Sequence, residues 1–101
     1  MTTQSSKKSL AMIAKKLSSD WKCNEAGTHI TFRKKFHSYL HAFMFLTRVS
    51  INAEVLATYP DIHLSKSELK ITVGGIAGLT TADIELAERI DDMVLSTTSS
   101  N

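Results

Sequence analysis

The stretch ELKITVGGIAGLTTADIELA, residues 68–87, decides the fold class, because its hydrophobic period changes along its length. Every second residue from Leu69 to Val73 is apolar, which is typical of a strand with one buried face. Gly74-Gly75 ends that strand. Thr80, followed three positions later by Asp83, predicts a capped helix start with negative charge at the positive end of the helix. We therefore expect a strand over 68–73 and a helix over about 81–94.

The rest of the chain supplies further elements of both kinds. Hydrophobic spacing and turn residues predict helices over about 6–19 and 37–58, strands over 21–23, 28–33 and 61–64, and turns over 24–27 and 65–67. The predicted order is α-β-β-α-β-β-α. We expect an α+β fold with a four-stranded antiparallel sheet and helices packed on one face.

The predicted helix over 37–58 has apolar residues on more than one face. Leu40, Phe43, Thr47, Ser50 and Ala53 mark one face, whereas Met44, Phe45, Ile51 and Val55 fall elsewhere. A helix of this kind needs two apolar partners. One is its own sheet, and the other is a second copy of the chain, so we expect a homo-oligomer formed through this helix or a sheet edge. Pro60 is predicted to end the helix, because proline pushes its preceding residue out of the α region.

Length and composition predict one compact domain over residues 1–101, with frayed ends at about 1–5 and 96–101. No apolar run is long enough to span a bilayer, and the first ten residues lack a secretory signal. Cys23 is the only cysteine, which excludes an intramolecular disulfide and fits a reducing cytosol. We expect Cys23 to be a half-buried strand residue and the protein to be cytoplasmic.

Charge is distributed unevenly along the chain. Residues 1–50 carry nine basic and two acidic side chains, whereas residues 51–101 carry three basic and eight acidic ones. The run Arg33-Lys34-Lys35 is a candidate contact for an acidic protein surface or for phosphates, with an ordinary charged strand end as the alternative. No nucleic-acid motif accompanies it, so we do not expect nucleic acid as the partner.

Metal and cofactor sites find little support in the sequence. His37 and His41 share a helix face at a spacing that can hold a metal ion, but no third ligand lies nearby in the sequence. We expect these histidines to be partly exposed surface residues. Gly74-Gly75 matches neither a phosphate-binding loop nor a dinucleotide fingerprint. The prediction is that the protein has no metal site and no cofactor.

Three local signals in this order resemble the pterin-4a-carbinolamine dehydratase family. They are the helix end Ala53-Glu54 with Pro60 following, the strand Leu69-Lys70-Ile71-Thr72-Val73, and the stretch Gly78-Leu79-Thr80-Thr81-Ala82-Asp83-Ile84-Glu85-Leu86-Ala87. The resemblance covers about 20–92. It implies the fold above and, for the family's enzymes, dehydration of a 4a-hydroxytetrahydropterin without a cofactor. That reaction needs a proton donor and a proton acceptor near neutral pH, for which the family uses histidines.

The resemblance places Thr58 and Tyr59 where the family has two histidines before its proline. The family's third histidine falls near 74–76, and residues 64–101 contain no histidine. Glu54 and Asp83 remain of the family's set, although a solvated helix end and a helix cap would each explain them. Threonine cannot serve as a base near pH 7. We therefore expect no dehydratase activity. The alternative is a dehydratase that uses Asp83, Glu54, Tyr59 and His63.

A narrower resemblance concerns Tyr59-Pro60-Asp61-Ile62-His63-Leu64, which is similar to a stretch of the pterin dehydratase-like proteins of α-carboxysomes. Those proteins have lost the catalytic set and are linked to Rubisco assembly. The resemblance implies a non-catalytic assembly factor or chaperone for carbon fixation in the bacterial cytoplasm, with the Rubisco large subunit as partner. Tyr59, Pro60, Asp61 and His63 become binding candidates beside Arg33, Lys34 and Lys35. A third reading is a coactivator-like dimerisation module.

Overall fold

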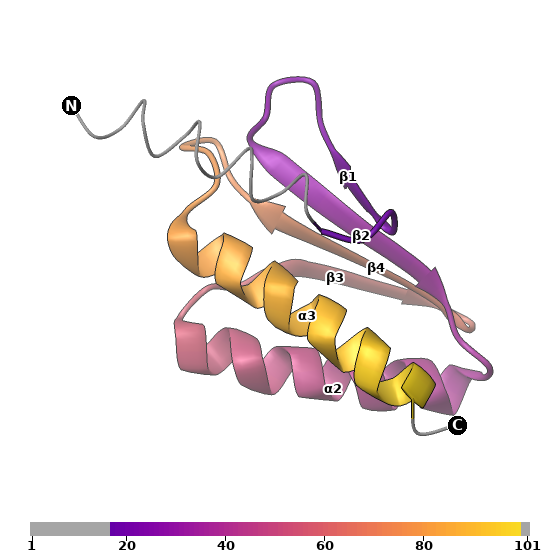
Figure 1. Ribbon diagram of the computed structural model, residues 1–101. Helices are drawn as coiled ribbons and strands as arrows, with labels where there is room; N and C mark the ends of the chain where they lie inside the picture. Colours follow the sequence, from indigo (N-terminus) through magenta and orange to yellow (C-terminus); the bar gives the residue numbers. More distant parts are fainter. Residues whose placement is uncertain (1–16, 100–101) are drawn as a thin grey trace.

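Figure 1 shows a computed structural model in which a sheet is covered on one face by two helices that run side by side. The structure describes residues 17–99, with side chains as far as Leu95. The elements are β1 (Trp21–Cys23), β2 (His29–Lys35), α2 (Tyr39–Leu56), β3 (Asp61–Ser65), β4 (Glu68–Gly74) and α3 (Thr81–Ser99). The four strands form one antiparallel sheet in the order β1-β2-β4-β3.

The hydrophobic core lies between the sheet and the two helices. Alternation in β2 and β4 turns one set of side chains inward, and cross-strand pairs such as Ile30–Val73 and Phe32–Ile71 are buried there. The other side of the sheet carries only polar side chains and glycine, so the sheet is buried on one face alone. Burial of one face fixes the register, because a slip of one residue would turn the apolar set to solvent.

Helix α2 buries a stripe that is shifted from the predicted face. Ala42, Phe45, Val49 and Ala53 are buried, while Leu40, Phe43, Thr47 and Ser50 are exposed. Of the predicted face only Ala53 packs on the sheet. Phe45 decides the orientation, because its ring stacks on Phe32 of the sheet with centroids 6.2 Å apart. Periodicity alone could not choose between faces that are both apolar.

Helix α2 ends earlier than predicted, and Pro60 does not end it. The last helical residue is Leu56, and Ala57 adopts a left-handed conformation with φ 55°. The Thr58 N–H donates to the Ala53 carbonyl (3.0 Å), and the Ala57 N–H donates to the Glu54 carbonyl (3.1 Å). This pair of bonds is a Schellman motif, which satisfies carbonyls that would otherwise lack donors. The helix therefore ends at Leu56, four residues before the proline.

Helix α3 begins as predicted and is longer than predicted. The Thr80 hydroxyl accepts from the Asp83 N–H (3.1 Å), and the Asp83 carboxylate accepts from the Thr80 N–H (3.0 Å). This reciprocal pair is a capping box. Asp91, further along the helix, accepts from the Trp21 indole (3.0 Å) and from Ser18 (2.8 Å to the backbone), so α3 is tied to the start of β1. The helix runs to Ser99.

The predicted α+β class, the four-stranded antiparallel sheet and both hairpins are confirmed. The predicted first helix over 6–19 lies outside the described residues, except 17–19, which are not helical. Cys23 is exposed rather than half-buried, because β1 is a short edge strand and this residue lies at its end. None of the helices in the described part of the chain is long and apolar enough to cross a membrane.

Candidate functional site

Thr58 and Asp83 form a partly buried polar contact between the chain just after α2 and the first turn of α3. The Schellman motif at the end of α2 places Thr58 beside the first turn of α3, and the Thr58 hydroxyl donates to Oδ1 of Asp83. Asp83 is only 7% exposed and is the one buried charged residue within the described chain. The other carboxylate oxygen, Oδ2, accepts from the Thr80 backbone. Both oxygens of this carboxylate therefore already have donors from the protein.

Most of the other residues predicted around this point are exposed to solvent. Tyr59 directly follows Thr58 but is 70% exposed. Glu54 lies on the exposed side of the last turn of α2, in agreement with the solvated helix end considered above, and Pro60 is half-buried. The structure thus brings Thr58 to Asp83 but leaves Glu54 and Tyr59 outside the enclosed contact. His63 lies on the outer face of β3, the face that points away from the helices. A general base drawn from these groups would have to act from the surface.

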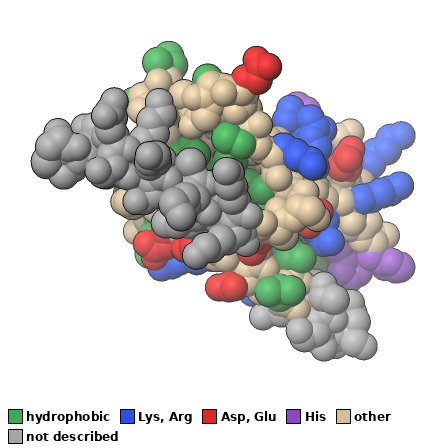
Figure 2. Space-filling view, turned by 45° about the horizontal axis from the view of Figure 1, so that its top comes forward, with side chains coloured by type: hydrophobic (Ala, Val, Ile, Leu, Met, Phe, Trp, Pro, Cys, Tyr) green, Lys and Arg blue, Asp and Glu red, His purple; other side chains and the backbone are tan. Residues whose placement is uncertain are grey.

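The remaining binding candidates divide between the two faces of the sheet. Arg33 and Lys35 point outward from β2, whereas Lys34 points to the helix side, where its ammonium lies 6.0 Å from the centre of the Phe36 ring. Asp61 and His63 point outward from the edge strand β3. Figure 2 shows Lys and Arg side chains together with histidines at one end of the molecule, where β2 ends and the β3–β4 turn lies.

Helix α2 exposes a second apolar face, as the sequence predicted. Its large side chains are Tyr39, Leu40, Phe43, Met44, Ile51 and Val55, each about half exposed or more. They follow one side of the helix over its whole length, opposite the stripe that packs on the sheet. Exposed apolar side chains gathered on one face are typical of interaction sites, so this face is a candidate one.

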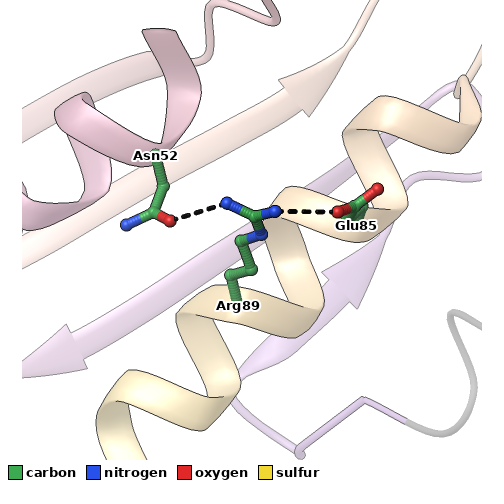
Figure 3. A network of polar contacts seen from close by, with 3 residues as sticks. All are labelled: Asn52, Glu85 and Arg89. Carbon is green, nitrogen blue, oxygen red and sulfur yellow. Dashed lines mark hydrogen bonds and ion pairs between the residues drawn. The ribbon is translucent and has the colours of Figure 1, made fainter. Parts of the chain in front are cut away.

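Sequence reasoning missed the polar network between α2 and α3. Arg89 donates to the Asn52 side-chain oxygen (3.0 Å) and to the Glu85 carboxylate (2.9 Å), as Figure 3 shows. Arg89 is partly exposed, so the Glu85 ion pair adds little stability, and the bond to Asn52 serves to align the two helices. The i, i+4 spacing of Glu85 and Arg89 could have predicted their pair, whereas nothing in the sequence indicates Asn52.

His37 and His41 are exposed as predicted, but they do not share a helix face, because α2 begins at Tyr39 and His37 precedes its N-cap Ser38. Both are exposed, and their rings meet edge to face with centroids 5.5 Å apart. The Ser38 hydroxyl lies 2.6 Å from Nδ1 of His41 and also caps the start of α2. No group of three His, Cys, Asp or Glu side chains within residues 17–95 is placed to hold a metal ion.

Comparison with known proteins assigns this chain to a protein family. The family model described as Pterin 4 alpha carbinolamine dehydratase matches residues 2–93. This chain belongs to that family. Among its relatives, a candidate pterin-4-alpha-carbinolamine dehydratase of Nostoc punctiforme is 33% identical over 77% of this chain and 84% of its own length. Another, from Rhizobium johnstonii, is 32% identical over 72% of this chain and 74% of its own length.

Two solved structures of the family share the fold. The transcriptional coactivator/pterin dehydratase from Brucella melitensis superposes with a TM-score of 0.75 at 22% identity, over 83% of this chain and 90% of that one. A pterin dehydratase-like protein identified as a RuBisCO assembly factor in the alpha-carboxysome gives a TM-score of 0.63 at 23% identity, over 73% of this chain and 88% of that one. The family fold is thus common to proteins with different described roles.

Proposed function

We propose that this protein is a non-catalytic member of the pterin dehydratase family that acts by binding another protein. The observation that carries the proposal is the Thr58–Asp83 contact. A carboxylate that is buried, capped by Thr80 and bonded to a hydroxyl performs a structural task. The resemblance places Thr58 at a histidine position of the family, and a hydroxyl cannot exchange protons near neutral pH as an imidazole does.

The most specific form of this proposal is an assembly factor or chaperone for Rubisco. Its support is the resemblance of residues 59–64 to the carboxysomal branch and the shared fold of the solved RuBisCO assembly factor. The implied partner is the Rubisco large subunit, and the implied setting is the bacterial cytoplasm, in carboxysome biogenesis and carbon fixation. Tyr59 fits a binding role, because an exposed tyrosine offers apolar area and a hydroxyl together.

We further propose that the exposed face of α2 joins two copies of the chain. Six large apolar side chains follow this face, and a matching helix from a second copy would remove all of them from water. A coactivator-like dimerisation module is the second candidate function, and the same face supports it. A face that exchanges partners would serve a coactivator, and one that self-associates permanently would not.

A dehydratase assay tests the proposal. The substrate is a 4a-hydroxytetrahydropterin generated in situ, and a histidine-containing member of the family serves as the positive control. We expect background turnover from the folded protein and binding to purified Rubisco large subunit in a direct titration. Turnover comparable to the control would overturn the non-catalytic proposal in favour of the dehydratase alternative with Asp83, Glu54, Tyr59 and His63. No binding to Rubisco would remove the assembly role.

A further inference from the structure

The outer face of the sheet, away from both helices, carries an ordered arrangement of charges. Strand register sets its residues in rows across the strands. One row is Arg33–Lys70–His63, the next toward the β3–β4 turn is Lys35–Glu68–Ser65, and the next on the other side is Lys22–Thr31–Thr72–Asp61. We call these rows together the outer sheet face. Apart from the threonine pair at its centre, it consists mainly of charged and ionisable side chains.

Arg33 and Lys70 lie directly opposite each other on neighbouring central strands. Side chains of directly opposed residues come within about 5 Å of each other at Cβ, and like charges at that distance destabilise a sheet. His63 faces Lys70 from the other side, so the row has no acidic member. In the part of the chain that the structure describes, the Glu85–Arg89 pair is the only ion pair, so neither Arg33 nor Lys70 is neutralised.

Two more lysines extend this basic surface. Lys35 follows Arg33 on the same face of β2, and Lys66 is exposed in the β3–β4 turn. Lys66 has a φ of 57°, a left-handed conformation that glycine adopts with less strain. The chain therefore places lysine at the turn at some cost in stability.

We propose that the outer sheet face docks an acidic, extended segment of the partner protein. A carboxylate between Arg33 and Lys70 can accept from both side chains. A second carboxylate two residues along an extended segment lies about 7 Å further on, which is also the spacing from Arg33 to Lys35 along β2. The inference rests on the proposed protein-binding function and names the chemistry that the partner must offer.

The other residues of this face favour a protein segment over a nucleic acid. Asp61 and Glu68 lie within the same rows as the cations and would repel the continuous phosphate backbone of a nucleic acid. The face has no Phe, Tyr or Trp side chain on which a base could stack. A peptide can space its carboxylates to avoid Asp61 and Glu68, whereas a phosphate backbone cannot.

The test measures binding of a fluorescein-labelled peptide of alternating Glu and Ser by fluorescence anisotropy, with a Gln/Ser peptide as the uncharged control. The variant Arg33→Gln/Lys70→Gln removes the central cations. Arg48→Gln/Arg89→Gln lowers the net charge equally, but both of these residues lie on the helices, away from the outer sheet face. We expect the first variant to raise the dissociation constant about tenfold, since one exposed charge pair changes an equilibrium constant by up to about fivefold. The control variant should change it less than about twofold.

A variant that is expected to bind more tightly controls for misfolding, because a misfolded protein would bind less. Glu68→Gln removes a carboxylate from the face, so we expect tighter binding of the acidic peptide. Equal weakening by the two double variants would overturn the proposal, because net charge alone would then explain binding. Tighter binding of a labelled oligothymidine, lost through Arg33 and Lys70, would assign the face to nucleic acid and overturn it as well. Dehydratase turnover by the same samples would overturn the non-catalytic function and leave this surface intact.

Discussion

Substituting Thr58 by valine tests whether Asp83 has become a structural group. Valine keeps the branched shape of threonine and removes only the hydroxyl that donates to Oδ1 of Asp83. The carboxylate would then keep the Thr80 N–H as its donor and remain buried, because the capping box is untouched.

The expected loss follows from the charge and burial of the acceptor. A hydrogen bond to a charged group contributes about 1.5–3 kcal/mol, and a buried acceptor that loses its donor incurs a desolvation cost of similar size. We therefore expect Thr58→Val to lower the free energy of unfolding by about 2 kcal/mol. For a domain of this length, that change corresponds to a fall in Tm of about 8–15 °C.

Urea denaturation followed by circular dichroism measures this loss, and an unchanged m-value would show that the folded and unfolded states are otherwise comparable. Thr31→Val is the matched control, since among the described residues the Thr31 hydroxyl bonds only to that of Thr72, and both side chains are half-buried on the outer sheet face. Thr58→Ser keeps the hydroxyl and should restore most of the stability. The reasoning is refuted if Thr58→Val stays within about 0.5 kcal/mol of the native protein or matches Thr31→Val.

Three further substitutions probe the sheet and the helix face. Gly74→Ala should lower the free energy of unfolding by about 3 kcal/mol or more, because Gly74 has a φ of 117° and a Cβ there would lie 2.1 Å from the Thr28 carbonyl oxygen. Gly75→Ala is the control and should be well tolerated, because a Cβ at Gly75 meets nothing within 4 Å. Equal effects of the two in urea melts would contradict this. Lys66→Gly should raise stability by about 1 kcal/mol by relieving the left-handed turn and should weaken binding of the acidic peptide; an unchanged melting curve would argue against strain. Met44→Glu should reduce the molar mass in light scattering to that of the monomer, and an unaltered oligomer would place the interface away from the exposed face of α2.

Local sequence patterns determined much of this fold. Alternation in residues 68–73 predicted β4, and the Thr80–Asp83 spacing predicted the start of α3, because strand burial and helix capping depend on neighbours within a few residues. That Thr58 and Tyr59 stand where the family has histidines remains a prediction from the resemblance. The sequence alone does not reveal the backbone requirement for Gly74, since the clash that demands glycine comes from Thr28, just before β2.

Tertiary structure decided the rest. Helix α2 had two apolar faces, and only packing of Phe45 against Phe32 settled which one meets the sheet. Thr58 and Asp83 meet because the left-handed Ala57, rather than Pro60, ends the helix and turns the chain toward α3. Arg33 and Lys70 lie far apart in the chain, and the β2–β4 register alone sets them opposite each other. Such contacts depend on how the helices and strands pack and pair. Burial of all the apolar side chains together selects that arrangement, and no local sequence pattern encodes it.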